Sequence, residues 1–215
     1  MKLRITCLLV LAASVSVVPA TAQVLYNNGP VNGTVDGWTI NFGFAVSDTF
    51  TLTSASTVTG VNFYTFALPG DFLENAEVAI TSSEFGGTTY SDQVVNFTPS
   101  NCSSNQYGYN ICLESSSGYS PVNLSAGSYW LTLENAVVND GDPIFWDENS
   151  GVGCTSPGCP SSASENSLGT IPSESFTVFG SASTSTTGTV PEPGSVMLVG
   201  SGILAIAGTI RRKLL

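Results

Sequence analysis

GSYWLTLEN, at residues 127–135, alternates apolar side chains with polar or amphipathic ones. In an extended chain, Tyr129, Leu131 and Leu133 fall on one face, and Thr132 falls on the other. This period of two is typical of a β-strand that packs one face against a core. Gly127 supplies a turn residue directly before it. The segment therefore predicts a strand that is buried on one side.

The same period recurs along most of the chain. DGWTINFGFA (residues 36–45) places Trp38, Ile40, Phe42 and Phe44 on one face. Similar stretches are DTFTLT (48–53), TGVNFYTF (59–66), AEVAIT (76–81) and ESFTVFG (174–180), and turn-forming pairs stand at 28–29, 32–33, 69–70, 86–87 and 140–141. Only residues 71–77 suggest a short helical turn. Roughly eight or nine such strands predict an all-β fold, a single antiparallel β-sandwich that is jelly-roll-like.

The N-terminus has the pattern of a secretory signal peptide. Lys2 and Arg4 precede the apolar run CLLVLAASVSVV, and an Ala-x-Ala site ends at Ala22. We expect residues 1–22 to be removed, with cleavage between Ala22 and Gln23. The β-sandwich is then expected outside the cytoplasm at residues 23–180.

The C-terminus predicts a membrane anchor. Residues 181–189 are a Ser/Thr linker. Residues 193–210 carry no charge and are about long enough to cross a bilayer as a helix. Arg211, Arg212 and Lys213 follow at once, which places the end of the chain in the cytoplasm. A buried core helix is the alternative, but a soluble helix would show a polar face.

Residues 190–215, VPEPGSVMLVGSGILAIAGTIRRKLL, resemble the PEP-CTERM sorting signal of Gram-negative bacteria. The resemblance rests on Pro191-Glu192-Pro193, a single apolar span and a basic end, in that order. It implies recognition by the membrane protease exosortase, an inner-membrane-anchored precursor that faces the periplasm, and a mature form at the cell surface or outside it. Such proteins are typically found where exopolysaccharide is made. The resemblance carries over no catalytic residue.

Two further stretches resemble the β-rich outer domains of PEP-CTERM proteins. They are AVSDTFTLTSASTVTGVNFY (residues 45–64) and VNLSAGSYWLTLENA (122–136). Both describe strands and a turn, so the resemblance bears on the fold and not on an activity.

The predicted mature domain contains no basic side chain. All five Lys and Arg residues lie in the two targeting segments, the chain has no His, and fifteen of the sixteen acids lie between residues 23 and 189. A domain without cations cannot neutralise phosphates, so we expect no nucleic-acid or nucleotide partner. Serine–histidine or cysteine–histidine catalysis, Schiff-base chemistry and His-based zinc sites are excluded for the same reason. What remains is carboxylate chemistry.

Cysteine usage agrees with export. Four cysteines follow the signal peptide, namely Cys102, Cys112, Cys154 and Cys159. They allow three connectivities, and the local pairing Cys102–Cys112 with Cys154–Cys159 is the most economical. A four-cysteine zinc site is the rival, but the oxidising exterior and the absence of C-x-x-C spacing disfavour it.

One acidic segment is a candidate metal site. NDGDPIFWDEN gathers Asp140, Asp142, Asp147, Glu148 and Asn149 within ten residues. Oxygen ligands at short spacing suit Ca²⁺, although the EF-hand spacing is absent. The alternative is a solvated acidic loop without a metal. Apart from this possible Ca²⁺, the sequence predicts no cofactor.

The expected function is that of a non-enzymatic surface or matrix protein associated with exopolysaccharide. Trp130 and Trp146 are candidate faces for stacking on sugars, and strand core is the alternative for both. A calcium-dependent carbohydrate-binding module is one alternative function. A glycan-active enzyme is the other, in which Asp147 or Glu148 would act with a second carboxylate.

Overall fold

A computed structural model describes residues 22–34 and 36–183. Residues 1–21, most of the linker and the C-terminal segment with its sorting motif and expected span lie outside these residues. The boundaries expected for the signal peptide, linker and anchor therefore stay predictions. Within the described part, no helix is both long enough and apolar enough to cross a membrane.

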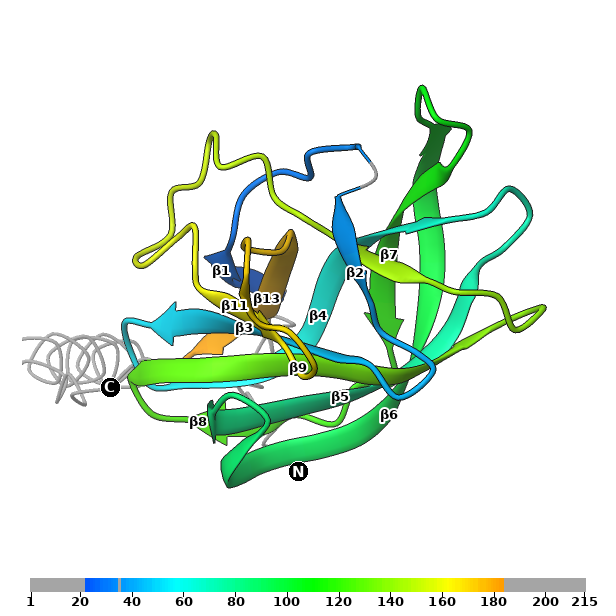
Figure 1. The fold of residues 1–215 in the computed structure, drawn as a ribbon. Coiled ribbons are helices and arrows are strands. Elements are labelled where there is room, and N and C mark those ends of the chain that lie inside the picture. Colours follow the sequence, from blue (N-terminus) through cyan, green and yellow to red (C-terminus); the bar gives the residue numbers. More distant parts are fainter. Residues whose placement is uncertain (1–21, 35, 184–215) are drawn as a thin grey trace, which may run out of the picture. The chain divides into compact units, whose positions relative to one another are not determined.

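Thirteen strands make up the described part, and every pairing between them is antiparallel (Figure 1). In chain order they are β1 (Gln23–Asn27), β2 (Gly37–Thr39), β3 (Ala45–Leu52), β4 (Ser56–Ala67), β5 (Leu73–Ser83), β6 (Gly86–Ser104), β7 (Asn110–Ser117), β8 (Val122–Leu124), β9 (Gly127–Val138), β10 (Phe145–Asp147), β11 (Ala163–Glu165), β12 (Gly169–Ile171) and β13 (Phe176–Ala182). Five of them, β2, β8, β10, β11 and β12, have only three residues.

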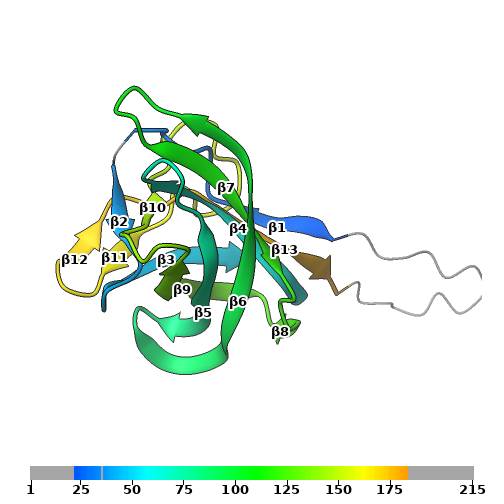
Figure 2. The same cartoon turned by 90° about the vertical axis from the view of Figure 1, so that its right-hand side faces the viewer.

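The longer strands have the order of a jelly roll. One sheet runs β1-β13-β4-β7 and the other runs β6-β5-β9-β3. The hairpin of β6 and β7 connects the two sheets, so that one hydrogen-bonded path curls through both (Figure 2). Successive long strands mostly change sheet, as in a rolled-up double Greek key. The predicted all-β, jelly-roll-like antiparallel fold is confirmed.

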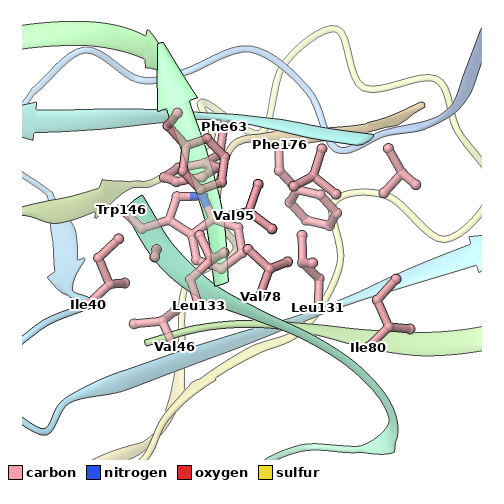
Figure 3. Packing of buried hydrophobic residues seen from close by; sticks show 14 of the residues in the cluster. Ile40, Val46, Phe63, Val78, Ile80, Val95, Leu131, Leu133, Trp146 and Phe176 are labelled. Carbon is pink, nitrogen blue, oxygen red and sulfur yellow. The ribbon is translucent and has the colours of Figure 1, made fainter. Parts of the chain in front are cut away.

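The core lies between the two sheets and follows the period of two. Leu131 and Leu133 of β9 are fully buried, as the alternation in residues 127–135 predicts. They face Phe63 of β4 and Phe176 of β13 across the core (Figure 3). Burying each such side chain contributes about 1.5–3 kcal/mol, and this drives the two apolar faces together.

Trp146 of β10 lies at the centre of this core. Its side chain is fully buried, and its ring packs against Phe63 at 5.7 Å and Phe176 at 5.6 Å between centroids. Its indole N–H donates to the backbone oxygen of Ser175 at 3.0 Å. Trp146 is therefore a core residue, and its expected role as a sugar-stacking face is wrong. Trp130 is half-buried on β9.

Two local expectations are also wrong. The strand expected over residues 36–45 stops near Ile40, because Asn41 and Gly43 form a turn in which Phe42 takes φ +58° and stays 64% exposed. The helical turn expected over residues 71–77 is instead the start of β5, because pairing with β9 (Leu73 opposite Val138) fixes it as a strand.

Both disulfides have the predicted local connectivity. Cys102 pairs with Cys112 across β6 and β7. Cys154 pairs with Cys159 inside the long loop between β10 and β11. The second disulfide closes a segment that contributes only one partly buried side chain, Cys159, to the core.

Candidate functional site

The structure divides the five residues of the predicted calcium site between two places. Asp140 and Asp142 lie in the loop between β9 and β10, whereas Asp147 ends β10 and Glu148 and Asn149 follow it. Each group meets other carboxylates that are far away in the sequence. We call Asp71, Asp140 and Asp142 the loop carboxylate cluster. We call Asp48, Asp147, Glu148 and Glu174 the buried carboxylate cluster.

The loop carboxylate cluster is built by two neighbouring loops. The antiparallel pairing of β5 with β9 brings the start of one strand beside the end of the other, with Leu73 opposite Val138. Asp71 precedes β5, and Asp140 and Asp142 follow β9. One carboxylate oxygen from each of the three lies within 4.8 Å of the other two. Among the described residues, no other group of three such side chains comes this close together.

Asn139 holds the two loops together. Its side-chain oxygen accepts from the backbone N–H of Phe72 at 2.8 Å, and its amide donates to the backbone oxygen of Gly70 at 3.3 Å. Its own backbone N–H donates to the backbone oxygen of Phe72 at 3.3 Å. The side-chain amide of Asn41 fixes the far end of the β9–β10 loop by donating to the backbone oxygen of Asp142 at 2.9 Å.

Like charges at the loop carboxylate cluster disfavour ionisation. Burial first, then a hydrogen bond with Asp140, and then the charges of Asp140 and Asp142 raise the pKa of Asp71 to about 6. Asp71 is 7% exposed, and its Oδ2 has no hydrogen-bond partner. Asp140 is exposed and Asp142 is half-buried. The cluster thus combines one buried carboxylate with two that reach the surface.

The buried carboxylate cluster lies where β10 meets the segment before β13. The backbone N–H of Ser175 donates to the backbone oxygen of Asp147, and that of Asn149 donates to the backbone oxygen of Ser173, both at 2.9 Å. Glu148 and Glu174 are direct partners in an antiparallel bridge. Asp147 and Glu174 are fully buried, and none of their four carboxylate oxygens has a hydrogen-bond partner.

Asp48 of β3 shows the opposite environment, because its carboxylate is surrounded by donors. It accepts from the backbone N–H of Glu174 at 2.7 Å, the backbone N–H of Thr49 at 2.6 Å and the side-chain amide of Asn28 at 3.2 Å. The hydroxyls of Ser161 and Ser173 also donate to it. Burial still raises its pKa to about 6, against the effect of these hydrogen bonds.

The pKa values of the two acids without hydrogen-bond partners, Asp147 and Glu174, are raised further. Burial, followed by the charge of Glu148, raises the pKa of Asp147 to about 8. Burial, followed by the charges of Asp48, Glu148 and Asp147, raises the pKa of Glu174 well above its ordinary value. The described part of the chain has no Lys, Arg or His, so within that part only a proton or a bound cation can cancel such a charge.

The remaining predicted residues are engaged in local structure. Glu148 accepts from the indole N–H of Trp38 at 3.2 Å. The side-chain amide of Asn149 donates to Ser173 at 2.8 Å, and its side-chain oxygen accepts from the backbone N–H of Gly151 at 2.8 Å. The side-chain oxygen thus holds the backbone of the β10–β11 loop, and the nitrogen ties this loop to the segment before β13.

Several grooves lie on the outside of the jelly roll. One of them, of about 440 Å³, has no carboxylate in its lining, and we call it the aromatic groove. Its lining includes Tyr64 of β4, Phe179 of β13 and the side-chain amides of Asn27 and Asn62. Aromatic faces with amides and hydroxyls around them suit sugar rings.

A second groove, of about 270 Å³, is acidic. It is lined in part by Asp92 of β6 and Glu134 of β9. Burial, followed by a hydrogen bond with Glu77, raises the pKa of Asp92, and burial with the charges of Glu77 and Asp92 raises that of Glu134. This acidic groove, which the sequence did not single out, brings carboxylates together at the surface.

Sequence reasoning missed Asp71, Asp48 and Glu174 as members of the two clusters. No local pattern marks them, because each is joined to its cluster by strand pairing between distant segments. The turn pair Pro69-Gly70 directly before Asp71 was the nearest signal, and it indicates only a loop.

A family model for the PEP-CTERM protein-sorting motif matches residues 189–213. The chain therefore carries this motif, which confirms the resemblance seen in its C-terminal segment. The motif marks an exported protein that exosortase sorts and whose precursor is membrane-anchored. No curated protein matches the chain.

Proposed function

We propose that this chain is a surface or extracellular-matrix protein whose jelly-roll domain associates with exopolysaccharide and catalyses no reaction. We further propose that exosortase removes its C-terminal anchor after export. The observation that carries the proposal is the sorting motif at residues 189–213 on a domain without a basic side chain. Such a domain is limited to neutral contacts and carboxylate chemistry.

The aromatic groove supports polysaccharide association. Tyr64 and Phe179 offer ring surface, and Asn27 and Asn62 offer both donors and acceptors to sugar hydroxyls. The lining carries no charge, so its selectivity depends on ring stacking and hydrogen bonds. The exposed loop residue Thr155, beside the Cys154–Cys159 disulfide, adds a hydroxyl to the rim.

The burial of Asp147 argues for binding without catalysis. A glycosidase acid must reach the glycosidic oxygen, whereas the Asp147 carboxylate has no exposed surface. Glu148 is half-buried and hydrogen-bonded to Trp38. The acidic groove favours the second candidate, a glycan-active enzyme, because Asp92 and Glu134 there lie at the surface with raised pKa values.

Binding and turnover can be measured on the same polysaccharides. The full chain is incubated with a panel of neutral and acidic bacterial polysaccharides, and both co-sedimentation and the release of reducing ends are recorded. We expect retention without release, and we expect Tyr64→Ala to weaken retention at least tenfold. Tyr107→Ala, at a 58% exposed tyrosine in the β6–β7 loop, is the matched control.

Two results would reject this proposal. Release of reducing ends that Asp92→Asn or Glu134→Gln abolishes would establish the enzyme at the acidic groove. Equal retention of the Tyr64 and Tyr107 variants would remove the aromatic groove as the binding surface.

Processing is tested separately by intact-mass spectrometry of the chain from cells with and without exosortase. We expect the mature protein to begin at Gln23 in both, and to lack Arg211, Arg212 and Lys213 only where exosortase is present. Replacing Pro191, Glu192 and Pro193 by alanines should leave the C-terminus intact. A full-length C-terminus in exosortase-positive cells would contradict the proposed removal of the anchor.

A further inference from the structure

The loop carboxylate cluster brings three acids together, and the described part of the chain holds no basic side chain to balance them. The sequence places its five Lys and Arg residues at positions 2, 4, 211, 212 and 213, all outside the described part. Asp71, Asp140 and Asp142 nevertheless converge to within 4.8 Å. At such a separation, like charges repel unless a proton or a cation lies between them.

The spacing fits one oxygen-binding cation. Calcium binds oxygen ligands at about 2.3–2.6 Å, so two oxygens on the same ion lie at most about 5 Å apart. The three carboxylate oxygens meet this limit in every pairing. Zinc would require His or Cys ligands, whereas the chain has no His, and the four cysteines of its described part are paired in disulfides.

Asp71 distinguishes this cluster from a solvated acidic loop. Solvated carboxylates satisfy their oxygens with water, but Asp71 is 7% exposed and its Oδ2 has no hydrogen-bond partner. A buried carboxylate oxygen without a donor is costly unless a cation takes the place of the missing donor. Because Asp71 is buried and Asp140 is exposed, an ion between them would be reached from solvent.

The backbone around the cluster is already fixed. Asn139 bonds the β4–β5 loop to the β9–β10 loop through both its side chain and its backbone, and Asn41 holds Asp142 in place. Ordered loops lower the entropic cost of bringing the ligands together. The sequence pair Asp140 and Asp142 thus gains a third ligand from a loop about 70 residues away.

We propose that Asp71, Asp140 and Asp142 bind one Ca²⁺ ion that joins the β4–β5 loop to the β9–β10 loop. The three carboxylates supply part of the six to eight oxygens that Ca²⁺ takes, and water supplies the rest from the exposed side of Asp140. Three carboxylates on loops predict a dissociation constant of about 10⁻⁴–10⁻³ M, as in extracellular calcium modules. The inference is independent of polysaccharide binding.

The test is calorimetric titration of CaCl₂ into the full chain after treatment with a chelator, together with thermal melts in Ca²⁺ and Mg²⁺. We expect one site, a rise in Tm of about 4 °C or more at saturation, and a much weaker response to Mg²⁺. Asp140→Asn should weaken Ca²⁺ binding at least tenfold. Asp140 is exposed, so this variant is expected to fold. Glu84→Gln, at an exposed acid of the β5–β6 turn, removes the same charge and should leave binding unchanged.

Three outcomes would overturn the inference. The first is the absence of both a binding heat and a Tm shift in the unmodified chain. The second is equal weakening by Asp140→Asn and Glu84→Gln, which would show a general charge effect. The third is a Ca²⁺ response that survives Asp140→Asn and Asp142→Asn but disappears in Asp147→Asn, which would place the ion at the buried carboxylate cluster.

Discussion

We predict that Asp147 makes the domain less stable as the pH rises. In the folded state its carboxyl has a pKa of about 8, raised from 3.8 by burial and then by Glu148. In the unfolded chain the same group returns to about 3.9. Between these values the native state keeps a proton that the unfolded state has lost. The contribution of Asp147 to the free energy of unfolding is therefore fully present below about pH 4, and it is lost as the pH rises towards 8.

The magnitude follows from linkage. When only the native state holds a given proton, each unit by which the pH rises lowers the free energy of unfolding by about 1.4 kcal/mol. Between pH 5 and pH 7, both of which lie inside this window, Asp147 alone accounts for a loss of about 2–3 kcal/mol. Burial also raises the pKa values of Asp48 and Glu114, to about 6 and about 7, so they add to the decline with the same sign.

The assay is urea denaturation of the full chain at pH 5, 6 and 7 in the presence of a chelator. Asp147→Asn keeps the shape of the side chain and cannot ionise, so its loss of stability from pH 5 to pH 7 should be about 2–3 kcal/mol smaller than that of the unmodified chain. Glu84→Gln should follow the unmodified chain, because Glu84 is exposed. A stability that rises with pH, or equal slopes for Asp147→Asn and the unmodified chain, would refute the reasoning.

Three further predictions concern the fold itself. Trp146→Ala should lower the free energy of unfolding by about 3–5 kcal/mol in urea denaturation, because it empties the centre of the core; Trp130→Ala, at a half-buried position, should cost clearly less. Thiol titration of the denatured, unreduced protein should find none of Cys102, Cys112, Cys154 and Cys159 free, and two reactive thiols would contradict the disulfide pairing. Gly180→Ala should lower the free energy of unfolding by about 1–3 kcal/mol, because the added Cβ would overlap the backbone oxygen of Thr57 in β4. Gly86→Ala is the control, because its Cβ would meet only one atom, at 4.0 Å. Equal stability of the two variants would reject the steric argument.

The jelly-roll strands could be predicted because their cores obey a simple period. Leu131 and Leu133 of β9, or Val78 and Ile80 of β5, alternate with outward-facing side chains over a whole strand. The three-residue strands β10, β11 and β12 are too short to show any period, so they could not be foreseen. The equally short β2 lies inside the strand expected over residues 36–45. The alternation through Phe42 was misleading because a turn interrupts it. The spacing of hydrophobic residues does not show that Phe42 takes a positive φ.

The candidate site could be predicted only where its residues are neighbours in the chain. Asp140 and Asp142 are two residues apart, and their turn is visible in the sequence. Asp71 joins them because β5 and β9 pair in a register that brings the start of one strand to the end of the other. Glu174 meets Glu148 through a single backbone bridge. Both contacts depend on register, which the sequence pattern of one strand does not determine.

The two carboxylate clusters should act on stability independently. The charges that shift Asp71 are those of Asp140 and Asp142, whereas those that shift Asp147 are Glu148 and Asp36, so neither cluster affects the other's acids. Sites without shared partners usually have additive effects on the free energy of unfolding, within about 0.5 kcal/mol. Their perturbations can therefore be combined in a thermodynamic cycle.

The cycle compares the Ca²⁺-induced gain in stability of the unmodified chain, Asp147→Asn, Asp140→Asn and the double variant at pH 7. We expect the same gain in Asp147→Asn as in the unmodified chain, and at most a small gain in both variants that carry Asp140→Asn. The reason is that the proposed ion neutralises only the loop carboxylate cluster, whereas Asp147 lies in the other cluster and keeps its proton at pH 7. A Ca²⁺-induced gain that Asp147→Asn reduces by more than about 1 kcal/mol would mean that the two clusters are coupled, and their separation would be wrong.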